Sequence, residues 1–342
     1  MSDIRLDSAR SQADSDYSLL FPDKGLLPGL ERLRLAAGGR IRGTLAGKRR
    51  SFTLGGSQEF ADYRPYAPGD DVRRIDWNVY GRTGKAFLRQ YWDEQELHVQ
   101  LYLDVSRSML GATRVAEGKL LYMLRLAACV GYVALCGDDR LVIRQFDEQD
   151  VKNELGPLRG RVSVSKLFRY LAEKARESES EAGRDAAADK VLATEGNLSL
   201  AHGSSSHLDM SIPFRKPGAL PRRSGVCWIF TDALYESGIQ ETLLSLVAAG
   251  QSVVLVQVFN PEELNPELSG ELRLIDSELG TGKEVAISPR ILARYREEAA
   301  AYQQELKAVC GEKGAVFVPL DTSIPIKTAL QRLAAVPGAI QA

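Results

Sequence analysis

The chain has 342 residues, of which 44% are hydrophobic and 26% charged, and its formal net charge is -1. This length and composition are those of a globular protein with a sizeable core and room for about two domains. A net charge this close to zero excludes a molecule-wide field that would attract nucleic acid or an anionic membrane.

The cysteines and histidines form no disulfide or zinc pattern. The four cysteines contain no Cys-x-x-Cys pair, and the three histidines have no metal-ligand spacing. This usage is typical of reduced thiols in a cytosolic protein. Residues 1–24 lack the apolar core of a signal peptide, and the apolar run 126–136 is too short to span a bilayer. We therefore expect a cytoplasmic protein without a membrane span.

The first part of the chain shows little periodicity. Residues 1–25 are predicted to form a disordered tail, and a short helix is predicted over 28–37. Residues 44–91 are rich in Gly, Pro, Arg, Asp and aromatic residues, so we expect loops there, with an extended stretch near 86–91. Residues 26–95 are thus treated as a segment of their own.

From residue 96 onward, apolar strands alternate with helices. Strands are predicted at 99–103, 141–146, 226–230, 253–258 and 316–318, and helices at 114–135, 164–176, 239–249, 291–310 and 326–333. Unbroken apolar strands are buried on both faces, as in parallel sheets covered by helices. The sequence therefore predicts an α/β domain over 96–335, with an open, doubly wound, mostly parallel sheet. A flexible insertion is expected at 177–207, which is rich in small and charged residues.

A candidate site follows the first of these strands. Asp104, Ser106 and Ser108 form an Asp-x-Ser-x-Ser pattern there, and Asp232 follows a second apolar strand. Ligands of open α/β sheets bind outside the carboxyl ends of the strands, and Mg²⁺ prefers oxygen ligands. The same residues also suit a helix cap or a turn, with Ser106 or Ser108 capping the next helix. The second strand-terminal aspartate favours a shared ion.

Two motifs resemble known families. Asp104, Ser106, Ser108 and Asp232 look like the metal-ion-dependent adhesion site of von Willebrand factor A domains. The segment EFADYRPYAPGDDVRRIDW at 59–77, followed by GKAFLRQY at 84–91, closely resembles the signature of the bacterial domain-of-unknown-function family fifty-eight. Members of that family pair the signature with a von Willebrand factor A-like domain and are commonly encoded beside MoxR-type AAA+ ATPases. The resemblance extends over about 26–333 of the chain.

The resemblance implies a metal site and a partner. Its ligands would be Asp104, Ser106, Ser108 and Asp232, together with a residue that is usually a threonine on a separate loop. Ser206, or next Ser205, stands in the matching stretch 203–208. The resemblance implies bound Mg²⁺ or Mn²⁺ with an open coordination position. It also implies a protein-binding module, not an enzyme, that acts with a MoxR-type ATPase and a client protein in protein assembly or maturation.

The signature segment also allows a prediction from its residues alone. It mixes charges of both signs with aromatic side chains: Asp70, Asp71, Arg73, Arg74, Asp76, Trp77, Tyr63, Tyr66 and Tyr80. Such a mixture suits an internal network of ion pairs and hydrogen bonds that holds loops on the core. The alternative is a docking surface, since Arg, Tyr and Trp are favoured at interfaces.

Two other functions use residues of this sequence. A Mg²⁺-dependent phosphoesterase would act through Asp104 and Asp232. A nucleic-acid binder would use the basic stretch Arg40–Arg50, for which a solvated loop is the favoured interpretation. Residues 280–283 match a phosphate loop only in part, because Glu284 takes the Ser/Thr position, and a hairpin turn is expected there.

Overall fold

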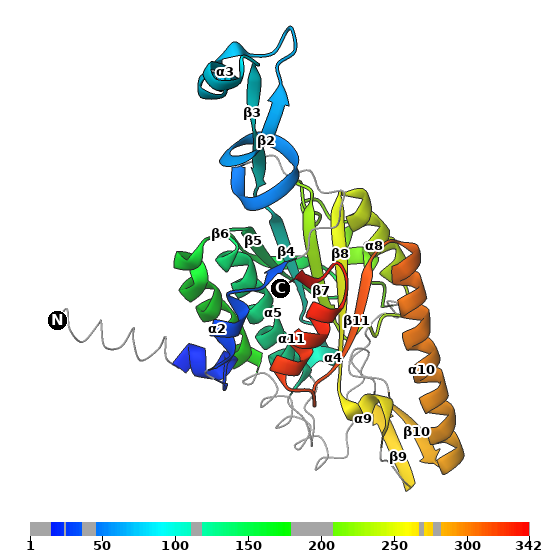
Figure 1. Ribbon diagram of the computed structural model, residues 1–342. Coiled ribbons are helices and arrows are strands. Elements are labelled where there is room, and N and C mark those ends of the chain that lie inside the picture. Colours follow the sequence, from blue (N-terminus) through cyan, green and yellow to red (C-terminus); the bar gives the residue numbers. More distant parts are fainter. Residues whose placement is uncertain are drawn as a thin grey trace, which may run out of the picture.

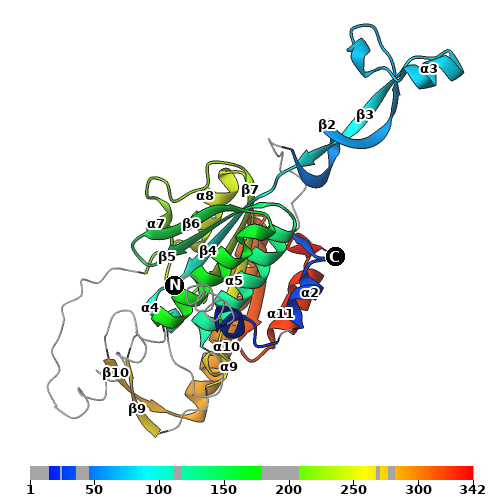
Figure 2. The same ribbon diagram turned by 90° about the vertical axis from the view of Figure 1, so that its left-hand side faces the viewer.

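The computed structural model describes residues 15–23, 25–35, 46–110, 118–178, 208–266, 270–275 and 282–341. The body of the described chain is built around a sheet with the strand order β11-β8-β7-β4-β5-β6, and a long arm projects from it (Figures 1 and 2). The strands of this sheet are β4 (His98–Asp104), β5 (Arg140–Phe146), β6 (Val151–Arg159), β7 (Gly225–Thr231), β8 (Gln251–Phe259) and β11 (Val316–Asp321).

Five of these strands run parallel. The pairs β4–β5, β4–β7, β7–β8 and β8–β11 are all parallel, whereas the edge strand β6 pairs antiparallel with β5. Every residue of β7 is buried, because its run GVCWIFT lies in the middle of the sheet with helices on both faces. The predicted strands and the mostly parallel sheet are confirmed, while β6 was not predicted.

Helices cover both faces of the sheet. The first face carries α5 (Lys119–Cys136), a helix over 164–178, α11 (Ile326–Ala335) and α2 (Leu26–Leu30), whose buried side chains form one apolar cluster with the sheet. The other face carries α7 (Ser211–Phe214), α8 (Ile239–Ala248) and α10 (Pro289–Glu312), which contribute to a second cluster. The sheet is thus open and doubly wound, as the alternating apolar segments predicted.

The central helix of the fold is α5. It begins at Lys119, directly after Gly118, so the predicted start at residue 114 lies in 111–117, outside the described residues. Its 18 residues have a mean hydropathy of 1.6, and by length and composition alone it could cross a membrane. In the fold, however, 83% of it is buried, and it packs against β4, β5 and β8.

Residues 15–23 lie on the body. Residues 15–20 form a helix, and Leu20 and Phe21 are buried in the first apolar cluster. The expected tail therefore does not extend over 15–23, because these apolar side chains have a place in the core; residues 1–14 lie outside the described part. The helix predicted over 28–37 is also corrected: α2 ends at Leu30, and β1 (Arg34–Leu35) pairs with β12 (Ile340–Gln341).

The arm is an antiparallel pair of strands, β2 (Ala46–Pro65) and β3 (Phe87–Gln95). At its tip are the 3₁₀ turn η1 (Val72–Arg74) and the helix α3 (Trp77–Thr83), and Figure 2 shows them far from the sheet. The loops expected over 44–91 are therefore mostly a hairpin. Its pairing contains several register shifts, so β2 lacks the regular alternation that reveals a strand in a sequence.

Short elements complete the described chain. They are α4 (Arg107–Leu110), η2 (Arg161–Ser163), α9 (Pro261–Leu264), β9 (Gly270–Ile275) and β10 (Gly282–Ile287). Strands β9 and β10 pair antiparallel; of the turn expected at 280–283, residues 282–283 belong to β10 and residues 280–281 lie outside the described part. Most of the insertion expected at 177–207 lies outside the described residues, since the helix of 164–178 is followed by the undescribed segment 179–207.

Candidate functional site

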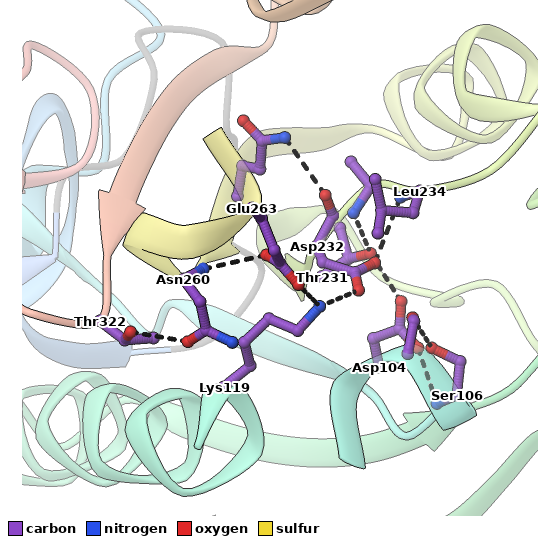
Figure 3. Close-up of polar contacts among 12 residues, drawn as sticks. Asp104, Ser106, Lys119, Thr231, Asp232, Leu234, Asn260, Glu263 and Thr322 are labelled. Carbon is purple, nitrogen blue, oxygen red and sulfur yellow. Dashed lines mark hydrogen bonds and ion pairs between the residues drawn. The ribbon is translucent and has the colours of Figure 1, made fainter. Parts of the chain in front are cut away.

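The carboxyl ends of the parallel strands carry a connected set of polar side chains. Asp104 is the last residue of β4, and Asp232 directly follows β7, the strand beside it. Neighbouring parallel strands end at one edge of a sheet, so the two aspartates lie in the same buried region (Figure 3). Ser106 follows on the turn after β4 and Ser108 lies in α4, whereas Ser205 and Ser206 lie outside the described residues.

Asp104 is fully buried and accepts hydrogen bonds at both carboxyl oxygens. Its Oδ1 accepts from the backbone N of Ser106 at 2.9 Å. Its Oδ2 accepts from the hydroxyls of Thr231 at 2.6 Å and Tyr235 at 3.1 Å. Burial, followed by the negative charge of Asp232, raises the pKa of the Asp104 carboxyl to about 7. The neutral, protonated form of Asp104 is therefore favoured unless a cation compensates the carboxylate.

The two serines bring their side-chain oxygens together. The Oγ atoms of Ser106 and Ser108 are 3.1 Å apart, and Ser106 is buried. Adjacent ligands of an octahedral Mg²⁺ site, with bonds of about 2.1 Å, are separated by about 3.0 Å. The spacing of these two oxygens, beside a buried carboxylate, therefore fits a small divalent ion.

Asp232 also contacts Lys119. The sequence did not predict a lysine at this site. Its Nζ is 2.7 Å from Asp232 Oδ2 and 2.6 Å from Glu263 Oε1, and only 2% of its side chain is exposed. Burial alone would favour the neutral amine, but the two carboxylates outweigh burial and raise the pKa of Lys119. The group is therefore an ammonium ion held inside the protein.

A chain of hydrogen bonds continues from Glu263 across the edge of the sheet. Glu263 Oε2 accepts from the backbone N of Asn260 at 2.9 Å, within the capping box that begins α9. Asn260 Oδ1 in turn accepts from the Thr322 hydroxyl at 2.7 Å. Asn260 follows β8 and Thr322 follows β11, so the ends of four neighbouring strands contribute to this region (Figure 3).

The backbone after β7 is held in place from several directions. Ala233 has a positive φ of 59°, which is uncommon for a residue with a side chain. The Tyr302 hydroxyl donates to the Ala233 carbonyl, and Gln257 Nε2 donates to the Asp232 carbonyl at 3.2 Å. These bonds fix the direction of the Asp232 side chain, whose Oδ1 accepts from the backbone N of Leu234 at 3.2 Å.

A cavity of about 300 Å³ lies between α8 and α10, and its lining includes Tyr235 and Tyr302. Tyr235 connects the cavity with Asp104, because it lines the cavity while its hydroxyl donates to that carboxylate. The cavity has apolar walls from Ile239 and Leu306 and acidic groups from Glu241 and Glu305.

The signature segment lies on the arm, away from the strand ends. Asp76 Oδ2 accepts from the Tyr63 hydroxyl and from Arg89 Nε, both at 2.8 Å, and Arg64 pairs with Asp70 at 2.6 Å. Asp76 Oδ1 also caps α3 by accepting from two backbone N atoms. The network of ion pairs predicted from the mixed charges is therefore present, although it holds the arm together and not loops on the core.

Only part of this region could be inferred from the sequence. The structure brings Asp104, Ser106, Ser108 and Asp232 to one edge, whereas Lys119, Glu263, Tyr235 and Thr231 were missed. The capping-box pattern from Asn260 to Glu263 was a readable signal for α9, but it gave no sign of the contact with Lys119. The basic stretch Arg40–Arg50 is described only from residue 46, where the backbone enters β2.

Comparisons with known proteins give a family and several relatives. The family described as "Protein of unknown function DUF58" matches residues 62–305. The uncharacterized proteins Rv1480 of Mycobacterium tuberculosis and Mb1516 of Mycobacterium bovis are each 26% identical over 300 residues, which is 88% of this chain and 86% of theirs.

Two solved structures are also similar. One is the conserved hypothetical protein BatB from Bacteroides thetaiotaomicron, with a TM-score of 0.33, 15% identity, and coverage of 70% of this chain and 98% of that one. The other is an aerotolerance-related membrane protein from Bacteroides fragilis, with a TM-score of 0.34, 15% identity, and coverage of 69% and 97%.

Proposed function

Since the chain belongs to the DUF58 family of proteins of unknown function, we propose that it is a divalent-metal-dependent protein-binding module with a von Willebrand factor A-like fold. In this proposal it acts in the bacterial cytoplasm with a MoxR-type AAA+ ATPase, in the assembly or maturation of a client protein, and it is not itself an enzyme. The ATPase partner rests on the family resemblance of the 59–77 signature.

One observation carries the metal-dependent part. Asp104, Ser106 and Ser108 offer a buried carboxylate and two hydroxyl oxygens at the end of β4, and Asp232 stands at the end of the neighbouring strand. Hard divalent ions prefer such oxygen donors. A set with few charged ligands leaves the ion electrophilic, so a carboxylate of the partner protein could complete its coordination.

The phosphoesterase alternative uses the same two aspartates. Within the part of the chain that the structure describes, no group of three or more His, Cys, Asp or Glu side chains suits a metal ion, so the proposed donor set depends on hydroxyls. Hydroxyl donors are those of an adhesion site, and for this reason binding is proposed ahead of hydrolysis. Mg²⁺-dependent turnover of a phosphoester by the purified protein would reverse this order.

Metal binding is tested by isothermal titration of Mg²⁺ and Mn²⁺ into the wild type and Asp104→Ala. The wild type is expected to bind and the variant to lose most of its affinity. The matched control is Asp147→Ala, since Asp147 follows the adjacent strand β5 but is paired with Lys152. Equal affinity in wild type and Asp104→Ala would reject the site.

Partner binding is tested by a pull-down of the purified MoxR-type ATPase with the full chain, with Mg²⁺ or with EDTA. Capture is expected only with the metal and only by proteins that keep Asp104. Equal capture in EDTA would leave a binding module whose strand-end motif is structural. No capture in either condition would remove the ATPase from the proposal without bearing on the metal.

A further inference from the structure

The edge of the sheet carries more negative than positive charge. Asp104, Asp232 and Glu263 contribute three carboxylates, and Lys119 is the one cation that the structure records in contact with any of them within its described residues. Lys119 contacts Asp232 and Glu263, whereas the recorded partners of Asp104 are uncharged donors. Lys119 therefore compensates the charges of Asp232 and Glu263, and no recorded cation contacts Asp104 within the described residues.

We propose that Lys119 is a resident cation of this edge, which occupies Asp232 and Glu263 and thereby weakens the binding of a divalent ion at Asp104, Ser106 and Ser108. This inference rests on the proposed function, because it takes the strand ends to be a cation site. It assigns to Lys119 a role in setting the affinity and not in holding the ion.

The position of the ammonium is fixed by the fold. Lys119 is the first residue of α5, which is buried against β4, β5 and β8, so the start of its side chain cannot shift. Each carboxylate that it contacts is bound at its second oxygen: Asp232 Oδ1 by the backbone of Leu234, and Glu263 Oε2 by the backbone of Asn260. The carboxylates therefore cannot turn toward another ion without losing bonds.

The charge of Lys119 opposes a second cation in two ways. It repels a divalent ion at the adjacent Asp104, in a buried region where charges are weakly screened. It also neutralises two carboxylates, and the number of charged ligands is a main determinant of divalent-ion affinity. Removing this charge should therefore strengthen metal binding, although Lys119 belongs to the same buried network.

The experiment compares the wild type with Lys119→Met, which keeps most of the side-chain length without the charge. Mg²⁺ and Mn²⁺ are titrated calorimetrically into both, and folding is checked by circular dichroism. We expect Lys119→Met to bind at least about tenfold more tightly, because a buried charge beside a divalent ion has been removed. The matched control is Lys152→Met, whose lysine pairs with Asp147 and is half-exposed, and it should bind as the wild type does.

The outcomes separate this inference from the proposed function. Metal binding by Lys119→Met and not by the wild type would support the resident cation and reject the proposed function. Equal affinity in the two proteins would reject the resident cation and leave the proposed function standing. Absence of binding in both would reject both.

A second variant tests the inference if Lys119→Met does not fold. The double variant Lys119→Met/Glu263→Gln removes one charge of each sign, so less unpaired charge stays buried, and Asp232 is still released. It too should bind Mn²⁺ more tightly than the wild type, and its melting temperature should rise more when Mn²⁺ is added. Affinity at or below that of the wild type would overturn the inference.

Discussion

Lys119 and Asp232 are 113 residues apart in the sequence, yet their side chains form a buried ion pair with an Nζ–Oδ2 distance of 2.7 Å. The pair connects the first turn of α5 to the end of β7. Because both side chains are almost fully buried, removing Lys119 leaves the Asp232 carboxylate without its cation, and removing Asp232 leaves Lys119 with Glu263 alone.

Lys119→Ala and Asp232→Ala should each lower the free energy of unfolding by about 3–5 kcal/mol, the usual cost of breaking a buried pair. The double variant should cost less than the sum of the two, since the Asp232 carboxylate is no longer left without Lys119, while the loss of the contact with Glu263 is the same as in Lys119→Ala. Urea unfolding followed by circular dichroism measures these values. The pair of Lys152 and Asp147 is half-exposed and should show a coupling below about 1 kcal/mol. Additive effects of the Lys119 and Asp232 changes would contradict the prediction.

The stability should also depend on the protonation of Asp104. Its pKa is raised from 3.8 to about 7 by burial and by Asp232, so the folded protein keeps a proton that the unfolded chain releases. This contribution to stability is fully present below about pH 4 and is lost as the pH rises through about 7.

Asp104→Asn removes this titration. Between pH 5 and pH 8, the free energy of unfolding of the wild type should therefore fall relative to that of the variant by on the order of 2 kcal/mol. Chemical unfolding of both proteins in EDTA at the two pH values gives the comparison. Mg²⁺ should stabilise the wild type more at pH 8 than at pH 5, since the ion and the proton compete for one carboxylate. A difference between the two proteins that does not change with pH would show that Asp104 is ionised throughout.

The arm should depend on Asp76 more than on its other acidic residues. Asp76 is buried, caps α3 and accepts from Tyr63 and Arg89, and Arg89 is the main cause that holds the pKa of this carboxyl well below its usual range. In Asp76→Ala, the amides of 60–89 should exchange hydrogen faster, with no change over β4 and β5.

Asp71→Ala is the matched control for the arm. Asp71 is exposed and caps only the short turn η1, so its removal should affect exchange near 72–74 alone. Equal exchange in Asp76→Ala and Asp71→Ala would mean that the network around Asp76 does not hold the arm.

Trp77 is 62% exposed, and Trp77→Ala should leave the melting temperature nearly unchanged.

Two glycines should respond to alanine in opposite directions. A Cβ at Gly225 would lie 2.0 Å from the His98 carbonyl oxygen, in the pairing of β7 with β4, so Gly225→Ala should destabilise by more than about 3 kcal/mol. A Cβ at Gly311 in α10 would meet nothing within 4 Å, and Gly311→Ala should stabilise by about 0.5–1 kcal/mol. Thermal unfolding gives both values, and a stable Gly225→Ala would place β7 differently from the structure.

The parallel strands could be predicted because each is an apolar run with no exposed face. Gly225–Thr231 and Gln251–Phe259 are buried along almost their whole length, and such runs have few other places in a fold. That Asp104 and Asp232 share an edge followed from the topology of parallel strands. The arm could not be predicted in the same way, because its pairing contains several register shifts, which interrupt the alternation of a regular strand.

Lys119 was missed for a different reason. A lysine at the start of an apolar helix normally points to solvent, and only the distant Asp232 and Glu263 make burial of this one favourable. Such a contact depends on how β7 and β8 lie beside α5, and no local pattern contains that information. Tyr235 is similar, since its role depends on the reach of its hydroxyl to Asp104.

The ion pairs of Lys119 also have a consequence for the order in which the chain is made. Synthesis proceeds from the N-terminus, so Lys119 leaves the ribosome well before Asp232, and Glu263 follows later still. Until β7 and the Asp232 that follows it are complete, α5 carries an ammonium ion with no partner at the end that must be buried. The helix can therefore take its final place only after β7 has been synthesised, and a fragment that ends before Asp232 should fail to bury it.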